Sequence, residues 1–234
     1  MSLISDNLQA VRADLAADAL NAGRDPQHIN LLAVSKTFGA DAVVEAVRAG
    51  QHCFGENYLQ EALDKMQAVH ALLPDVTLEW HFIGPIQSNK TRQIAENFSW
   101  VHSVDREKIA ARLSEQRPEG MPPLNVCLQV NISAEASKSG VLPSDALPLA
   151  KRIANLKGLH LRGLMAVPEA SEDPLVQRAA FSRLRELKQQ IEAQGIPLDT
   201  LSMGMSGDMN AAIAEGSTMV RIGSAIFGKR TYAT

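Results

Sequence analysis

The sequence predicts an α/β fold of the (β/α)₈ barrel class. Short apolar runs alternate with amphipathic helical patterns along the whole chain, and eight strand-like runs are each followed by a helical segment. A length of 234 residues, with 45% hydrophobic residues, suits one barrel with a full core. We therefore expect a single domain over residues 1–234, a TIM-type barrel with an extra N-terminal helix.

An open, doubly wound sheet is the alternative to the barrel. Its common nucleotide-binding forms carry a GxGxxG motif after the first strand or a GxxxxGK[ST] loop. This chain contains neither motif, so the barrel is favoured.

The first half of the chain predicts an N-terminal helix and four strand–helix pairs. Ile4, Leu8, Val11 and Leu15 recur at helical spacing, and Gly23 ends this helix. Apolar runs without alternation predict strands at 31–36, 52–55, 78–83 and 100–103. The helices between them are expected at 43–50, 57–72 and 86–98, and a fourth, capped by Asp105, runs to Glu115.

The second half continues the alternation. Strands are predicted at 124–130, 159–167, 200–203 and 219–222. Ser144 is the expected cap of a helix that runs to Asn155, and Asp173 followed by Pro174 is typical of a helix start. A short helix at 209–215 and a turn opened by Gly223 and Ser224 complete the pattern.

Composition argues against several function classes. The net charge is −3 and the basic residues are spread along the chain, which counts against nucleic acid and anionic membrane as partners. The N-terminus lacks a basic segment followed by an apolar core, so we expect a cytoplasmic protein.

Cys53 and Cys127 are expected as reduced core thiols. The six histidines form no HxxxH or HxH pair, so no metal site is expected, and His81, placed near the barrel mouth, is expected to have a structural role.

Lys36 is the most informative residue of the chain. It is the only charged residue between Ile29 and Asp41, and it closes a buried strand. A partly desolvated amine with a lowered pKa suits Schiff-base chemistry, although an isolated lysine more often extends its amine to solvent. The catalytic face of a barrel lies at the C-terminal strand ends, where Lys36 is predicted.

Small polar residues gather after the seventh and eighth predicted strands. Ser206 and Gly207 precede one helix start, and Gly223 and Ser224 open a short turn. Barrels commonly bind phosphate at this position through backbone N–H groups. Turn geometry and helix capping explain each residue equally well by itself, but two adjacent loops together indicate an anion site.

Arg221 interrupts the apolar eighth strand and needs a hydrogen-bonding partner inside the barrel. A core salt bridge would satisfy it. A lysine amine, a phosphate site and an interior arginine on neighbouring strands also describe a site for pyridoxal 5'-phosphate (PLP). In that interpretation the aldehyde bonds Lys36, the phosphate lies at Ser206, Gly223 and Ser224, and Arg221 faces the ring nitrogen.

The chain resembles the PLP homeostasis protein family, also called YggS or PROSC, along essentially its whole length. The segments that carry the resemblance are LLAVSKT, FGENYLQE, EWHFIGPIQSNK, VNISAEASKSG, GLMAVP and SMGMSGDMNAAIAEGSTMVRIGSAIFG. It implies a barrel like the N-terminal domain of alanine racemase, fold type III among PLP proteins, with PLP as a Schiff base on Lys36. It also implies a pocket lined by Asn57, Ser206, Arg221, Gly223 and Ser224, with Ser224 where a threonine is frequent; Ile83 and Met165 are candidates for packing on the ring.

The function expected from this resemblance is storage, buffering or delivery of PLP without strong catalysis. An arginine at the ring nitrogen keeps it unprotonated and makes the ring a weak electron sink. Neither Tyr58 nor Tyr232 is placed as a base, and the chain ends at Thr234 without the second domain that closes the racemase site. We expect PLP-requiring apo-enzymes as partners and a monomer or weak dimer.

The alternative functions are a weakly active racemase-like PLP enzyme and a lysine-dependent aldolase. Lys138, in the loop after the fifth strand, is a further amine at the same face of the barrel.

Overall fold

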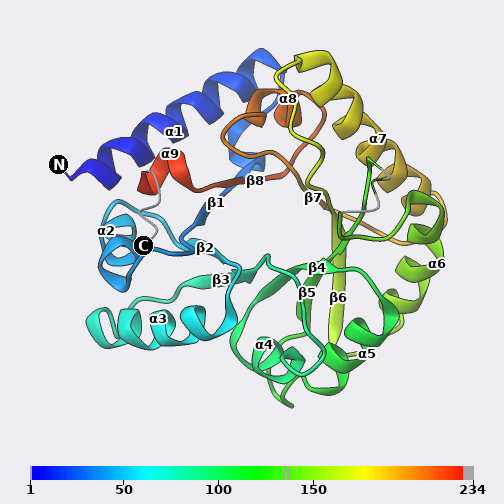
Figure 1. Ribbon diagram of the computed structural model, residues 1–234, viewed down its shortest axis with the longest axis horizontal. Helices are drawn as coiled ribbons and strands as arrows, with labels where there is room; N and C mark the ends of the chain where they lie inside the picture. The colour runs from blue at the N-terminus through cyan, green and yellow to red at the C-terminus, as the bar shows by residue number, and fades with distance from the viewer. Residues whose placement is uncertain (1, 134, 136–137, 229–234) are drawn as a thin grey trace.

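The computed structural model describes residues 2–133, 135 and 138–228. Eight parallel strands form a closed barrel in the order β1-β2-β3-β4-β5-β6-β7-β8, with helices around it (Figure 1). The predicted α/β barrel is therefore confirmed. The strands are β1 Asn30–Val34, β2 Cys53–Glu56, β3 Glu79–Phe82, β4 Trp100–Val104, β5 Leu124–Gln129, β6 Leu159–Met165, β7 Thr200–Ser202 and β8 Met219–Ile222.

Helices follow each strand, and one helix precedes the first strand. They are α1 Leu3–Asn21, α2 Ala40–Arg48, α3 Leu59–Leu72, α4 Thr91–Asn97, α5 Glu107–Glu115, α6 Pro143–Ala154, α7 Pro174–Glu192, α8 Met209–Ala214 and α9 Ser224–Phe227, with a 3₁₀ turn η1 at Pro26–His28. The expected N-terminal helix is α1. None of the described helices is long and apolar enough to cross a membrane.

Several of the predicted helix starts differ from the structure, including those expected at 43 and 57, where α2 begins at Ala40 and α3 at Leu59. The helix expected from residue 86 begins at Thr91, because Ile86 is buried in the core and a turn follows, in which Lys90 N–H donates to Gln87 O. Asp105 and Ser144 do not cap their helices: the N-cap positions are Arg106 and Leu142, which make no side-chain cap bond. Proline at N1 has its φ preset for a helix, so Pro143 starts α6 without a polar cap.

The remaining cap prediction, at Asp173, is confirmed. Its carboxylate accepts a hydrogen bond from Leu175 N–H, and Pro174 occupies the first helical position of α7. Leu184, Leu187 and Ile191 form the buried stripe that packs this helix on the barrel.

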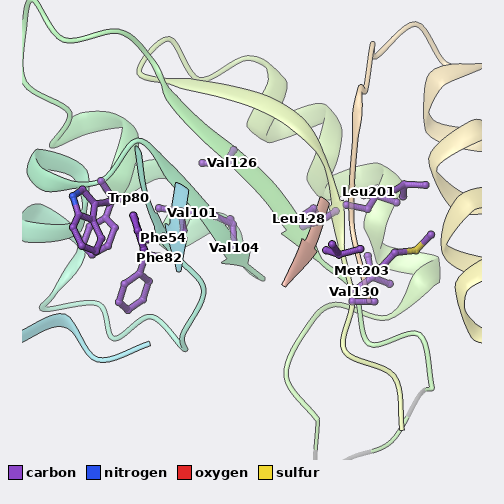
Figure 2. Close-up of a cluster of buried hydrophobic side chains, with 14 of the residues drawn as sticks. Phe54, Trp80, Phe82, Val101, Val104, Val126, Leu128, Val130, Leu201 and Met203 are labelled. Carbon is purple, nitrogen blue, oxygen red and sulfur yellow. The ribbon is translucent and has the colours of Figure 1, made fainter. Parts of the chain in front are cut away.

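The main hydrophobic core lies between the barrel and its ring of helices. It takes residues from every strand, such as the alternate residues Trp80 and Phe82 of β3 and Leu201 of β7 (Figure 2). The residue between Trp80 and Phe82 is His81, which therefore points to the barrel interior. A small separate cluster of Trp100, Cys127 and Met165 is also buried. The apolar core therefore supports the barrel from outside, which leaves room for polar side chains within it.

Helix α1 braces the last two helices of the chain (Figure 1). Asn7 Nδ2 donates to Ile226 O of α9 at 2.9 Å, and Asn210 Nδ2 of α8 donates to Asp18 Oδ1 at 2.7 Å. Arg24, just beyond α1, donates to Ile213 O of α8 at 2.8 Å. The extra helix thus holds the two short helices that follow the loops predicted to bind an anion.

Candidate functional site

A cavity of about 400 Å³ opens at the C-terminal ends of the strands. This volume lies within the usual range for small-molecule sites. All eight residues predicted from the sequence line it: Lys36, Asn57, Ile83, Met165, Ser206, Arg221, Gly223 and Ser224. Gly207 lines it as well, as do Val34, Val167 and Met205, which the sequence analysis did not select. These three were missed because an apolar side chain carries no chemical signal of a site.

Lys36 lies in a turn two residues after the end of β1, and the backbone around it is held tightly. Thr37 is the only described non-glycine residue with positive φ, at 69°, a conformation that costs free energy for a branched side chain. Its N–H donates to Glu61 Oε1 at 2.6 Å. On the other side of Lys36, the hydroxyl of Ser35 donates to Glu56 Oε1 at 2.6 Å.

A buried ion network supplies these contacts. Lys65 Nζ of α3 donates to Glu56 Oε1 at 2.6 Å, to Ser35 O at 2.8 Å and to Glu61 Oε1 at 3.0 Å. The Glu56 side chain is fully buried, and burial raises its carboxyl pKa against the opposing effect of Lys65. The network clamps both neighbours of Lys36, and the sequence analysis missed it. The Glu61 and Lys65 spacing of four residues on one helix was the available signal.

Asn57 follows β2 directly and reaches the cavity beside Lys36. Its Oδ1 is buried and has no hydrogen-bond partner among the described residues. Gly84 makes this placement possible, because a Cβ at residue 84 would lie 2.2 Å from Asn57 O. The cavity lining thus includes a residue whose side-chain acceptor is buried and unpaired among the described residues.

The loops after β7 and β8 meet at the same side of the cavity. Arg221 N–H donates to Gly204 O at 2.9 Å, which ties β8 to the loop that leads to Ser206. Gly204 has φ +97°, and a Cβ there would lie 2.6 Å from Ala212 Cβ of α8, so only glycine fits. Ser224 begins α9, whose first N–H groups have no partner within the helix.

Arg221 is buried inside the barrel, and the partners of its guanidinium are not carboxylates, so the alternative of a core salt bridge does not hold among the described residues. One guanidinium nitrogen donates to Ser202 Oγ at 2.7 Å and the other to Ala166 O at 2.9 Å. Burial lowers the pKa of Arg221 to about 10, so it remains a cation at neutral pH. No acidic side chain within the described chain forms a salt bridge with it.

The cavity is therefore suited to an anion. Its described lining holds two basic side chains, Lys36 and Arg221, and no acidic one. Its other walls are apolar side chains, Asn57, and the serine and glycine residues of the two loops.

Other sequence-based predictions concern residues outside this cavity. Tyr58 is 55% exposed and lies in a neighbouring groove, and Tyr232 lies outside the described residues. Lys138 pairs with Glu135 at 3.5 Å and is not among the described lining residues.

Cys127 is buried as expected, whereas Cys53 is only half-buried because it starts β2 at the opposite end of the barrel.

The expected position of His81 near the barrel mouth was wrong. It is fully buried and lines a second cavity at the N-terminal strand ends, together with Cys53 and Glu79. Its ring is hydrogen-bonded, which agrees with the structural role that the sequence favoured. These three side chains place donor atoms within 4.8 Å of one another, in a combination that could hold a metal ion; sequence spacing did not predict this group.

The fold and the site place the protein in a defined class. Residues 7–231 match the family model described as alanine racemase, N-terminal domain. An alanine racemase of Clostridium difficile shares the fold at a TM-score of 0.69 and 15% identity, over 94% of this chain and 57% of the racemase. The class is thus the alanine racemase type of barrel.

Within this class, the chain belongs to the pyridoxal phosphate homeostasis protein family. It is 61% identical over 232 residues to the member from Pseudomonas aeruginosa, covering 99% of this chain and 98% of that protein. The Escherichia coli member is 51% identical over 234 residues, covering 100% and 99%. PipY of Synechococcus elongatus, solved with PLP bound, matches at a TM-score of 0.82 and 36% identity, over 96% of this chain and all of PipY. The resemblance noted in the sequence is confirmed.

Proposed function

We propose that this protein binds PLP in the cavity at the C-terminal strand ends and stores, buffers or delivers it. One observation carries the proposal: Lys36, Arg221 and the loops of Ser206 and Ser224 come from distant parts of the chain and line one cavity. The names of the relatives and the PLP-bound structure of PipY support it.

The residues of the cavity fit this cofactor chemically. PLP carries a phosphate, and the lining has two cations and no acidic side chain among the described residues. Ile83 and Met165 supply apolar surface for a ring, and the buried Oδ1 of Asn57 is an acceptor without a partner in the described chain. The serine hydroxyls and the first N–H groups of α9 would hold the phosphate.

Lys36 would hold the cofactor by its aldehyde. When bound, PLP supplies an electrophilic aldehyde and a ring that withdraws electrons. The neutral Nζ amine of Lys36 would be the nucleophile that holds this aldehyde covalently, and its two hydrogens would leave with the aldehyde oxygen as one water. The network of Glu56, Glu61 and Lys65 would keep this amine pointing into the cavity by holding Ser35 and Thr37.

Arg221 would set the properties of the bound ring. Its guanidinium is a cation and a donor only, so it leaves a facing ring nitrogen unprotonated. A ring in that state is a weak electron sink, which suits a carrier better than an enzyme. The family name likewise suggests a non-catalytic role.

The wider proposal concerns how the carrier works. It would act as a single barrel domain, as a monomer or weak dimer in the cytoplasm, and would pass PLP to apo-enzymes that require it. The exposed rim of the cavity, which includes Val167 at 41% and Met205 at 39%, gives the cofactor a route in and out.

Mapping the covalent link tests the proposal. We expect the purified protein, incubated with PLP and reduced with borohydride, to carry the pyridoxyl group on Lys36. Lys36→Ala should lose most of the label, while Lys138→Ala, which removes an amine outside the cavity lining, should keep it. Labelling spread over surface lysines, or unchanged by Lys36→Ala, would contradict the proposed site.

A further inference from the structure

A continuous chain of hydrogen bonds crosses the interior of the barrel. Arg221 Nη1 donates to Ser202 Oγ at 2.7 Å, and Ser202 Oγ lies 2.8 Å from His102 Nδ1. His102 Nε2 lies 2.9 Å from His81 Nδ1, and His81 Nε2 lies 2.8 Å from Glu79 Oε1. The five side chains come from four strands: β8, β7, β4 and β3.

The chain joins the two ends of the barrel. Arg221 lines the cavity of about 400 Å³ at the C-terminal strand ends. Glu79 lines a cavity of about 260 Å³ at the N-terminal strand ends, where its side chain is 44% exposed. Ser202, His102 and His81 between them are fully buried. Buried polar groups are costly unless they are paired, so a path of this length is a built feature of the barrel.

With both buried imidazole rings neutral, the chemistry of the two ends determines every hydrogen between them. Arginine has only donors, and a carboxylate has only acceptors. Glu79 therefore accepts from His81 Nε2–H, which leaves His81 Nδ1 as the acceptor for His102 Nε2–H. His102 Nδ1 then accepts from the hydroxyl of Ser202, whose oxygen accepts from Arg221. Each of the four hydrogen bonds points from Arg221 towards Glu79.

We propose that Ser202, His102, His81 and Glu79 form a one-way hydrogen-bond relay that positions Arg221 and transmits the charge of Glu79 to the cofactor cavity. The last part of this inference, the effect on bound PLP, rests on the proposed function. The relay itself does not.

Two further observations agree with the relay. Burial lowers the pKa of His81 and takes that of His102 well below its ordinary value, so both rings are neutral at pH 7. Cys53 Sγ donates to Glu79 Oε1 at 3.7 Å, so the potential metal ligands Cys53, Glu79 and His81 satisfy one another through hydrogen bonds. A neutral ring has one donor and one acceptor, which is what each position of the relay requires.

The direction of the relay is tested on the protein without added PLP. Nitrogen-15 resonances of the imidazole rings distinguish the two neutral tautomers. We expect both His81 and His102 as the Nε2–H tautomer between pH 7 and pH 8, and we expect Glu79→Gln to produce mixed tautomers, because an amide can either accept or donate. An Nδ1–H tautomer or a doubly protonated ring at either position in the parent protein would overturn the relay, whatever the protein binds.

Matched variants test the coupling to the cavity. Ser202→Ala breaks the relay beside Arg221, and its control is Ser217→Ala, another fully buried serine that donates only to backbone carbonyls. Glu79→Gln removes the charge at the far end, and its control is Asp199→Asn, a carboxylate bonded to Arg162. The readouts are thermal stability, PLP affinity and the ring-nitrogen resonance of ¹⁵N-labelled PLP.

We expect Ser202→Ala and Glu79→Gln to shift the ring-nitrogen resonance and to weaken PLP binding by about three- to tenfold, the effect of one ordinary hydrogen bond. Both controls should leave that resonance in place, even where they lower stability. The coupling is refuted if Glu79→Gln behaves like Asp199→Asn, or if Ser202→Ala lowers stability without moving the resonance. Failure of the parent to bind PLP would instead contradict the proposed function and leave the tautomer test intact.

Discussion

At the scale of single residues, the buried charged groups near Lys36 are those whose burial costs free energy. Lys65 is buried and holds the carboxylate of Glu56, whose second oxygen is buried without a partner in the described chain. Removing one partner of such a pair leaves an uncompensated charge, which costs more than the pair itself contributes. What these residues contribute in return is contacts that hold the backbone on both sides of Lys36.

We therefore predict that Lys65→Met destabilises the protein by about 3–5 kcal/mol, the usual penalty for breaking a buried ion pair. The free energy of unfolding in urea measures this loss. Lys188→Met is the control, because it breaks the partly exposed pair of Lys188 and Glu192 and should cost less than about 1 kcal/mol. Adding Glu56→Gln to Lys65→Met should recover part of the stability; no recovery would mean that the penalty arises from lost packing.

At the scale of elements, the two loops that line the cavity depend on helices too short to be stable alone. Helix α8 has six residues and α9 has four, and isolated helices of that length do not form in water. Helix α1, with 19 residues, supplies partners for both. Asn7 satisfies the carbonyl of Ile226, near the end of α9, where the helix itself supplies no N–H.

We predict that Asn7→Ala lowers the free energy of unfolding by about 0.5–1.5 kcal/mol and weakens PLP binding, because α9 loses its brace. Asn97→Ala is the matched control: Asn97 is exposed and bonds only within its own helix, to Gln93 O. Calorimetric binding of PLP and of unphosphorylated pyridoxal separates the two effects. If Asn7→Ala weakened both ligands equally, the brace would not act through the phosphate loops.

At the scale of the whole molecule, a polar path joins the two ends of the barrel. Arg221 lines the cavity at the C-terminal strand ends, while Glu79 lines the cavity at the opposite end, together with Arg162, and ends the path through the interior. The hydrogen bond from His81 holds the pKa of Glu79 below its ordinary value. The folded protein therefore binds this proton less readily than the unfolded chain does.

This difference predicts a pH dependence of stability. The contribution of Glu79 is present above its unfolded pKa of about 4.3 and is lost as the pH falls through the lower folded value. Parent protein should thus lose stability between about pH 5 and pH 3 more steeply than Glu79→Gln. Urea unfolding of both proteins at several pH values gives the comparison, and parallel curves would show that Glu79 makes no such contribution.

The sequence was most informative where one residue contradicted its surroundings. Lys36 closes an apolar run of the sequence and Arg221 interrupts another, and both line the cavity. Asp173 before Pro174 combined two helix-start signals and caps α7, whereas Asp105 and Ser144 offered one signal each and do not cap. Local signals are reliable where several agree. A single polar residue near a helix start can form hydrogen bonds with groups other than the first N–H groups of the helix.

By itself, the sequence determined the order of strands and helices and the barrel class, and it placed Lys36, Arg221 and the serine and glycine loops at the cavity, because these follow from local patterns and from the rule that barrel sites lie at the C-terminal strand ends. Asn57, Ile83 and Met165 were expected there only from the family resemblance. Only the tertiary structure decided which side chains meet. His102 bonds Ser202 across 100 residues of sequence, and Lys65 reaches back to Ser35 across 30. Strands of a parallel barrel are buried on both faces, so their apolar runs carry no alternation that marks the interior. Closure of the barrel sets the register, and the register brings those polar groups together.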